Sequence, residues 1–331
     1  MASAHGDQRL REVLVLTVRK GFWASPESEA FPHRVFVPTP FGHSTSLANM
    51  LLGAGRGLWA FLRHRPRLLL IGSAHRLVPP LLFLRRLGLL RRTGLVVTNQ
   101  VFFGPRFGRF ADRVIVYSSR ETEGRRNYAY VPIPVGDLSW VVPEAAPEPY
   151  VFSGGGELRD FASLFAAVEG TGLRLTVVTH SPETLGVDGP PPAGSRVLWR
   201  MPLDRFLALM AGSSFVVVPL HGLDTPHGHT TIAQALCLGK AVVTTRGSAV
   251  ADYVRDGVEG LLVDPGDVAG YRKAMTRLAT DDELRLACEE AARARAPEFT
   301  HTAFARSLTE LCLEVLEERS TVPARAGARP G

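Results

Sequence analysis

Short apolar runs rich in valine, leucine and isoleucine alternate with amphipathic segments along most of the sequence. Continuous apolar runs are typical of strands buried on both faces, as in parallel sheets covered by helices. The amphipathic segments repeat their apolar residues at helical spacing. This alternation predicts an α/β protein. In the first half the expected strands are 12–18, 33–39, 67–72, 94–99 and 113–119, and the expected helices are 45–63 and 76–91.

A second alternating series begins at residue 150. A helical stripe formed by Phe161, Leu164, Phe165 and Val168 follows its first strand. The expected strands are 150–155, 174–180, 196–200, 214–220, 240–245 and 260–265, and the other expected helices are 204–212, 230–238, 268–279, 282–294 and 301–318.

Proline-rich residues 131–149 separate the two series and are interpreted as a linker. The sequence therefore predicts two Rossmann-like domains with parallel sheets, residues 1–142 and 143–318, and a disordered tail at 319–331. Ligands of open α/β sheets bind beyond the carboxyl ends of the strands. Two such domains facing each other across a cleft would place one ligand site on each wall.

The net charge of +6 comes almost entirely from arginine. This bias does not indicate nucleic-acid binding, and we expect no nucleic-acid partner. Cys237, Cys288 and Cys312 lie far apart among apolar neighbours and are interpreted as buried, reduced thiols. The first residues lack a signal-peptide pattern, so a cytoplasmic protein is expected. The sequence shows no Asp-x-Asp pair and no metal-ligand spacing, which predicts chemistry without a metal.

Residues 56–92 combine nine arginines with leucine, phenylalanine and tryptophan. The stretch LLFLRRLGLLRR at 81–92 fits a basic amphipathic helix on an anionic membrane surface. It also fits a core helix whose arginines face water, which the surrounding strand–helix–strand pattern favours. Peripheral contact with the inner face of a membrane through 56–92 stays open. No apolar run reaches the ~18–20 residues needed to span a bilayer.

Residues 216–267 contain an ordered series of short motifs: a strand ending in proline, a glycine-containing loop, a helix, Gly239-Lys240, Asp256-Gly257, Gly260–Val263 and Pro265–Asp267. In this order and at these spacings they resemble the family 4 glycosyltransferases of the GT-B fold. Residues 107–121, FGRFADRVIVYSSRE, are similar to the last strand of that family's first domain. The resemblance places the acceptor site in the first domain and the nucleotide-sugar donor site in the second.

The resemblance implies a retaining, metal-independent hexosyltransferase in carbohydrate or natural-product biosynthesis. Its donor would be a UDP-, GDP- or dTDP-linked sugar used as substrate, and no cofactor is implied. Its acceptor would be a hydroxyl of a small metabolite, a polysaccharide or a lipid-linked saccharide. The alternative is a catalytically impaired relative that binds the donor or acts as an auxiliary subunit of a partner enzyme.

The start of the expected helix 230–238 is the first candidate for holding the donor diphosphate. Gly228, His229, Thr230 and Thr231 stand there, and unpaired N–H groups at a helix start bind anions. The alternative is a simple threonine cap on a buried helix.

The family's Glu-x7-Glu motif is degenerate, because its two positions fall on Pro226 and Gln234. The resemblance gives Gln234 the role of accepting hydrogen bonds from the donor ribose. A neutral acceptor is expected to weaken this contact by about one to two kcal/mol compared with a carboxylate.

Arg159 in the stretch SGGGELRDF is the second candidate diphosphate anchor, with Gly154 and Gly155 offering backbone N–H groups. A surface ion pair is its alternative role, and the glycines could equally form only a tight turn. Arg200, at the end of a strand, is near the expected base pocket. An ordinary exposed arginine explains it equally well.

Three residues are the catalytic candidates. His75 and Gln100 follow strands of the first domain at its carboxyl edge. His227 stands beside Pro226, and together with Gly228 and His229 it could take over part of the role of the missing first glutamate. Each of them also fits an ordinary loop residue.

Overall fold

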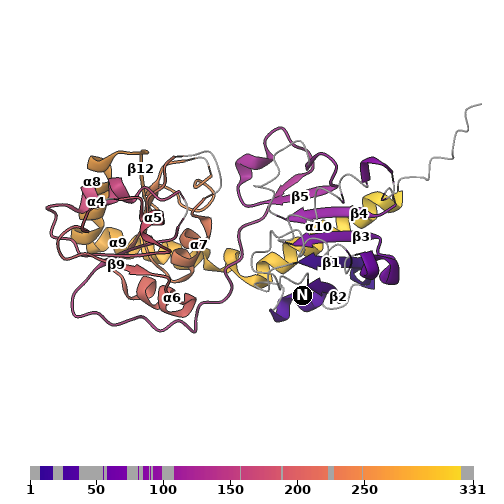
Figure 1. Ribbon diagram of the computed structural model, residues 1–331, viewed down its shortest axis with the longest axis horizontal. Coiled ribbons are helices and arrows are strands. Elements are labelled where there is room, and N and C mark those ends of the chain that lie inside the picture. Colours follow the sequence, from indigo (N-terminus) through magenta and orange to yellow (C-terminus); the bar gives the residue numbers. More distant parts are fainter. Residues whose placement is uncertain are drawn as a thin grey trace, which may run out of the picture. The chain divides into compact units, whose positions relative to one another are not determined.

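The protein is described from a computed structural model. It describes residues 8–17, 25–36, 55, 58–72, 81, 85–88, 90, 92–98, 108–156, 158–187, 189–222, 227–247 and 249–321. The chain divides into two compact units: Met1–Val131 with Phe304–Gly331, and Pro132–Ala303. Each unit is built on its own sheet (Figure 1).

The first unit contains a six-stranded parallel sheet in the order β2-β1-β3-β4-β5-β6. One face is covered by α10 (His301–Thr321), whose Phe304, Leu308 and Val315 pack against strand residues such as Val15. Three central strands are buried along their whole length, which explains their continuous apolar sequences. The strands are β1 (Val13–Thr17), β2 (His33–Phe36), β3 (Leu68–Gly72), β4 (Gly94–Thr98), β5 (Arg113–Val116) and β6 (Tyr128–Tyr130).

The second unit contains a six-stranded parallel sheet in the order β12-β11-β10-β7-β8-β9. Helices cover both of its faces, which gives two core clusters, one including Phe161 and Tyr271 and the other Ile232 and Tyr253. The strands are β7 (Val151–Gly154), β8 (Leu175–Thr179), β9 (Arg196–Trp199), β10 (Val216–Val218), β11 (Val242–Thr245) and β12 (Gly260–Val263). The helices are α4 (Phe161–Val168), α5 (Pro182–Leu185), α6 (Leu203–Gly212), α7 (His229–Cys237), α8 (Val268–Thr280) and α9 (Asp282–Arg295).

The motifs after β11 have a structural basis in the second unit. A side chain at Gly260 would place its Cβ 1.8 Å from the carbonyl oxygen of Val242 on the neighbouring strand. The carboxylate of Asp256 accepts a hydrogen bond of 2.9 Å from the backbone N–H of Leu262. Asp267 caps α8 by accepting from a backbone N–H of its first turn. These residues fix the turn before β12 and the start of α8.

The predicted α/β architecture with two parallel sheets is confirmed, and each predicted strand corresponds to an observed one. Strand β6 and helix α5 were not predicted. The expected helices 45–63 and 76–91 lie mostly outside the described residues, although 58–64 is helical. Of the expected disordered tail, 319–321 belong to α10, and 322–331 lie outside the described residues.

The prediction of a linker at 131–149 is only partly correct. Ile133 and Val135 pack against the core of the second unit, and the N–H of Val135 donates to the carbonyl of Phe299 at 3.0 Å. The structure therefore divides the chain after Val131, eleven residues before the expected boundary at 142/143. The carboxyl-terminal helix, expected in the second domain, belongs to the first unit from Phe304 onward.

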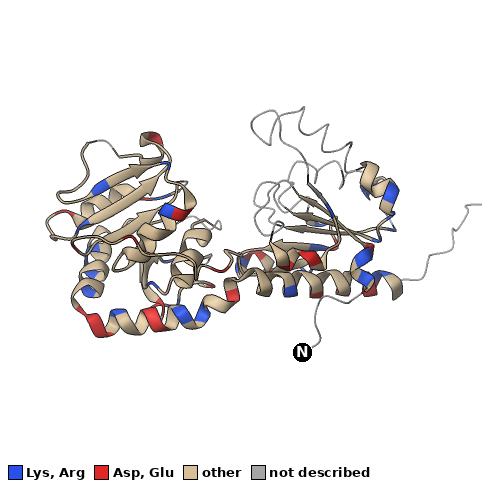
Figure 2. Cartoon of the chain, turned by 90° about the horizontal axis from the view of Figure 1, so that it is seen from below, with Lys and Arg blue, Asp and Glu red and all other residues tan. Residues whose placement is uncertain are grey.

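All three cysteines are free thiols, as predicted. Cys288 and Cys312 are buried, whereas Cys237 is only partly buried. Acidic and basic residues are interspersed along α9 and α10 (Figure 2), with pairs such as Arg293–Glu289 at 3.1 Å on α9. Within the described ranges, no helix combines the length and apolar character required to cross a membrane.

Candidate functional site

The site is built at the carboxyl edge of the second sheet, beginning with the turn that follows β7. Gly155 has φ +112°, and a Cβ there would lie 2.6 Å from a guanidinium nitrogen of Arg159. At Gly156 a Cβ would lie 2.6 Å from the ring of His180, which follows β8. Leu158 has the left-handed φ of +58°. The turn is therefore glycine-rich because two side chains lie directly against its backbone.

Arg159 is buried at this turn. It is 8% exposed, and its Nε donates to the carbonyl oxygen of Gly154 at 3.2 Å. Burial lowers the pKa of the guanidinium to about 10, so the group still carries its positive charge at neutral pH. Its Nη2 donates to the hydroxyl of Thr231 in the first turn of α7 at 3.2 Å. The two predicted diphosphate anchors, the residue-159 guanidinium and the α7 start, thus lie side by side.

Gly228 occupies the cap position just before the first residue of α7. It has φ +81° and no side chain to cap the helix. A Cβ at this position would lie 3.2 Å from side-chain carbons of both Val218 and Leu220. His229, Thr230 and Thr231 form the first helical turn, with Thr230 exposed. A helix without a side-chain cap leaves its first N–H groups for water or a ligand.

The positive charge of Arg159 and the positive end of the α7 dipole occupy the same place. A helix amino terminus carries roughly half a positive charge, so a cation beside it is unfavourable without an anion. Only a group of negative charge turns both features into favourable interactions. The arrangement is therefore suited to bind a phosphate or another anion.

Hydrogen bonds fix the backbone on which the site rests. Residues 159 and 220 form an antiparallel bridge. The hydroxyl of Thr245, at the end of β11, lies 2.6 Å from the N–H of Leu220 and 2.9 Å from its carbonyl oxygen. It also lies 2.6 Å from the hydroxyl of Tyr271 on α8. The ends of β10 and β11 and the start of α4 are therefore held together.

Gln234 lies one turn further along α7. It is 9% exposed. A nearly buried amide can hydrogen-bond a ligand at little reorganisation cost. This agrees with the predicted ligand role of Gln234, which stays a prediction.

The side chain of His229 lies in the core of the unit, so the predicted role of His229 in phosphate binding falls to its backbone and stays a prediction. Its ring is 3% exposed, stacks on Tyr253 at a centroid distance of 4.6 Å and interplanar angle of 10°, and its Nε2 bonds the carbonyl of Ala249 at 3.0 Å. Burial lowers its pKa to about 4, which makes it a neutral core side chain that donates to that carbonyl. Only the backbone of His229 remains available to a ligand.

Arg200 follows β9 on the same edge of the sheet. Its Nε donates to the carbonyl of His180 at 3.3 Å, and its φ of +51° is unusual for a residue with a side chain. Among described non-glycine residues only Arg65, Leu158 and Arg200 have positive φ, so two of three lie beside this site. Strained backbone of this kind is concentrated at ligand sites.

Of the three catalytic candidates, His75 and Gln100 lie outside the described residues, as does Pro226. His227 is partly buried next to Gly228 at the start of α7. The described part of the chain holds no cluster of three or more His, Cys, Asp or Glu residues that could hold a metal ion.

His180 and the pair Asp160 and His221 were not predicted from the sequence. His180 follows β8, and its place after the strand RLTVVT was the available signal. Asp160 caps α4, and its carboxylate lies 4.0 Å from Nδ1 of His221. Both groups stand at the same carboxyl edge, one after β7 and one after β10.

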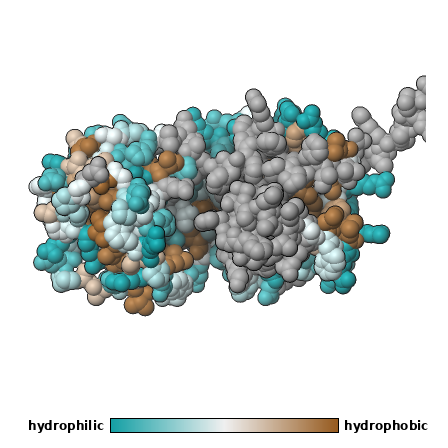
Figure 3. All heavy atoms as spheres, viewed as in Figure 1, coloured by the Kyte–Doolittle hydropathy of each residue, from teal (hydrophilic) through white to brown (hydrophobic). Residues whose placement is uncertain are grey.

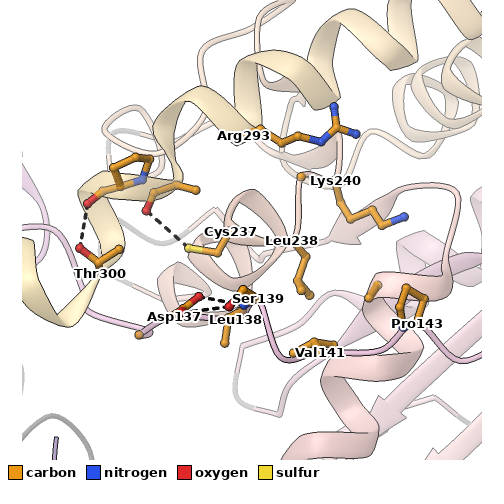
Figure 4. Close-up of a pocket in the computed structure, with 15 residues that line it drawn as sticks. Asp137, Leu138, Ser139, Val141, Pro143, Cys237, Leu238, Lys240, Arg293 and Thr300 are labelled. Atoms are coloured by element: carbon orange, nitrogen blue, oxygen red, sulfur yellow. Dashed lines mark hydrogen bonds between the residues drawn. The ribbon is translucent and has the colours of Figure 1, made fainter. Parts of the chain in front are cut away.

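A separate pocket of about 600 Å³ lies elsewhere in the second unit (Figure 4). Cys237 and Leu238, at the carboxyl end of α7, line it together with Lys240 and Arg293. Burial raises the pKa of the Cys237 thiol to about 12. Because its lining comes from the end of α7 opposite to Gly228, this pocket is not part of the site described above.

The comparisons with known proteins agree with this architecture. Residues 158–281 match the family model of the glycosyl transferases group 1. The D-inositol 3-phosphate glycosyltransferase of Corynebacterium jeikeium is 31% identical over 120 residues, 36% of this chain and 28% of that protein. The chain thus spans less than a third of the length of this curated relative.

Two solved structures share the fold of nearly the whole chain. A glycosyltransferase from Rickettsia africae matches with a TM-score of 0.70 at 11% identity, covering 92% of this chain and 98% of that one. Anabaena HepE, solved with UDP and glucose, matches with a TM-score of 0.62 at 16% identity, covering 92% and 94%. The chain has the two-domain, Rossmann-like GT-B architecture.

Proposed function

We propose that this chain, whose residues 158–281 match the group 1 glycosyl transferases, is a glycosyltransferase that moves a sugar from a nucleotide diphosphate to a hydroxyl acceptor. The observation that carries the proposal is the contact between the buried guanidinium of Arg159 and Thr231 in the first turn of α7. A diphosphate supplies the negative charge for which these two elements are suited. The structural relative solved with UDP supports uridine nucleotides as the first donors to test.

The proposed chemistry follows from charge stabilisation. When the bond between sugar and diphosphate breaks, negative charge grows on the departing phosphate oxygen. Arg159 and the N–H groups of Thr230 and Thr231 stabilise that charge without moving, because they are already in position. This mechanism needs no metal. If the departing phosphate takes the proton of the acceptor hydroxyl, the sugar is transferred with retention of its anomeric configuration. Metal independence, retention and a hexose as the transferred sugar are parts of the proposal.

Gln234 is proposed as the partner of the donor ribose, through its side-chain carbonyl oxygen. Its low exposure and its position one helical turn after Thr230 support this role. The predicted N–H contact of Gly155 is not proposed again, because this N–H donates to the carbonyl of Val178 at 3.0 Å. Gly154 is proposed to offer its backbone N–H group, and Arg200 and His180 to border the nucleoside.

A second candidate function is donor binding without transfer, in an auxiliary subunit. It is favoured by one observation: the residue at the proposed ribose position is the neutral Gln234. A binding protein needs only ground-state contacts, whereas catalysis needs contacts that strengthen in the transition state. The two functions therefore differ in turnover and not in donor affinity.

The test is a thermal-shift screen of UDP-, GDP- and dTDP-linked sugars, followed by hydrolysis and transfer assays with the donor that stabilises most. Stabilisation with slow donor hydrolysis is expected for the transferase. Binding without hydrolysis or transfer to any hydroxyl acceptor would favour the auxiliary function. No stabilisation by any nucleotide would contradict both.

The acceptor is proposed to be a small metabolite, a polysaccharide or a lipid-linked saccharide. The proposed setting is the cytoplasm, including its membrane face, in carbohydrate or natural-product biosynthesis. One relative is named a D-inositol 3-phosphate glycosyltransferase and another a lipopolysaccharide core biosynthesis glycosyltransferase, so both polar and lipid-linked hydroxyls belong in the assay.

A further inference from the structure

Positive charge is concentrated in one part of the first unit. Between Glu29 and Asp112 the sequence contains twelve arginines and no acidic residue. Since the whole chain has a net charge of +6, the remaining sequence is net negative. Charge of one sign gathered in this way attracts an anionic partner over about one Debye length, ~10 Å at 0.1 M salt.

The helix at 58–64 in this segment exposes large apolar side chains. Trp59 and Leu62 are each 63% exposed, and Leu58 is 59% exposed. Ala60, on the other side of the helix, is fully buried against the sheet. The helix is therefore attached to the unit by one face and presents a second apolar face to its surroundings.

Arginines border these apolar side chains. The guanidinium of Arg63 lies 5.6 Å from the ring centroid of Trp59. Arg65 and Arg86 are exposed, and Leu87 beside Arg86 is 58% exposed. Within the described ranges, no acidic residue forms an ion pair with Arg63, Arg65 or Arg86, in contrast to the arginines that pair with Glu12 and Asp112.

Both segments stand at the same edge of the sheet. Residues 58–64 precede β3 and residues 85–88 precede β4, and these two strands pair directly through Leu68 and Gly94 at their starts. Hydrophobic and strongly hydrophilic surface lie next to each other at the right-hand end of this unit in Figure 3. We call residues 58–67 and 85–88 the basic apolar surface.

We propose that the basic apolar surface docks the protein on an anionic lipid bilayer. Trp59, Leu58 and Leu62 would enter the region between headgroups and acyl chains, and Arg63 and Arg86 would contact lipid phosphates. A nucleic acid would also attract the arginines, but it gives no reason for three large apolar side chains on one exposed helix. The surface belongs to the first unit and shares no residue with the donor site of the second.

The test is co-sedimentation of the full chain with vesicles of phosphatidylcholine alone or mixed with phosphatidylglycerol. Binding is expected only to the anionic vesicles, and it should weaken as salt is raised. Trp59→Ala with Leu62→Ala should lower the partition coefficient roughly tenfold or more. Arg63→Ala and Arg86→Ala should each lower it about fivefold. Circular dichroism and thermal unfolding verify that each variant is folded.

The matched control replaces equally exposed side chains of the second unit, Trp140→Ala with Leu203→Ala, which are 55% and 61% exposed. This variant should bind vesicles as the parent chain does. Equal binding to neutral and anionic vesicles would overturn the proposal. Equal losses of the partition coefficient in the control variant and in the variants of the basic apolar surface would also overturn it. The same holds if the chain binds an oligonucleotide and binds neither kind of vesicle. UDP affinity should be the same in every variant, so failure here leaves the donor site untouched.

Discussion

The Nη2 atom of Arg159 donates a hydrogen bond of 3.2 Å to the Thr231 hydroxyl, joining two segments 72 residues apart in the sequence. One partner follows β7 and the other begins α7, and β7 pairs with β10 just before α7. The contact therefore depends on the parallel order of the sheet. It brings a charged side chain to the positive end of a helix, which is suited to an anionic ligand.

Replacing Arg159 with alanine is expected to weaken UDP binding about 10- to 150-fold, since a hydrogen bond to a charged group contributes about 1.5–3 kcal/mol. Isothermal titration calorimetry measures the change. The matched control is Arg205→Ala, which removes an exposed arginine 3.4 Å from Glu144 in the same unit and should leave affinity unchanged. Equal affinity of Arg159→Ala and the parent chain would remove Arg159 from the site.

Gly228→Ala is expected to lower both stability and UDP affinity. At φ +81° an alanine is strained by about 1–2 kcal/mol, and its Cβ would also press on Val218 and Leu220 at 3.2 Å. Gly257→Ala is the matched control, because its φ of +76° is similar but nothing lies within 4 Å. Both variants should lose stability in urea titrations, and only Gly228→Ala should bind UDP more weakly. The same affinity loss in both would show that backbone strain alone is responsible.

Gln234→Ala is expected to lower UDP affinity about two- to tenfold, the range for a neutral hydrogen bond of about 0.5–1.5 kcal/mol. Gln234→Glu should strengthen binding, because a carboxylate accepts stronger hydrogen bonds from ribose hydroxyls. Titrating 2′-deoxy-UDP as well localises the contact, since both effects should shrink with the deoxy ligand. Unchanged binding in both variants would place the ribose elsewhere.

The buried ring of His229 predicts a loss of stability in mild acid. Its pKa is about 4 in the folded chain and about 6.5 when unfolded, so the unfolded state binds more protons between these values. Above pH ~6.5 the ring is neutral in both states and lowers no stability. As the pH falls toward ~4 the free energy of unfolding decreases, by about 2 kcal/mol at pH ~5. His229→Phe keeps a ring against Tyr253 but does not titrate. Urea titrations above pH ~6.5 and at pH ~5 measure the free energy of unfolding. Between these conditions the variant should lose less stability than the parent chain, and an equal loss would exclude His229 as the cause.

The sequence was sufficient to predict the order of strands along the chain. It also singled out Arg159 and the start of α7, which the structure places side by side. Continuous apolar runs such as those of β1 and β10 identified buried parallel strands. Arg159 and the start of α7 were found because each follows a strand of the second sheet, and parallel strands bring their carboxyl ends to one edge. Gly155 and Gly228 were expected to serve a ligand or a tight turn, whereas the structure shows positive φ values and side chains packed directly against both residues.

The direction in which an individual side chain points was harder to predict from the sequence. The ring of His229 is set by Tyr253 and Ala249, which lie some twenty residues later and on a different element. No local pattern distinguishes a histidine that faces a ligand from one that faces the core. Strand β6 was missed because its three residues are too few to show a period, and its pairing with β5 comes from tertiary contact.

The central claim is that a diphosphate is held between the first turn of α7 and Arg159. The most direct measurement is a crystal structure of the chain with UDP. The account predicts phosphate oxygens within hydrogen-bonding distance, about 2.7–3.2 Å, of the backbone N–H groups of Thr230 and Thr231 and of the Arg159 guanidinium. A diphosphate bound away from both elements, or an Arg159 that keeps only its contacts with Gly154 and Thr231 while UDP sits elsewhere, would contradict it.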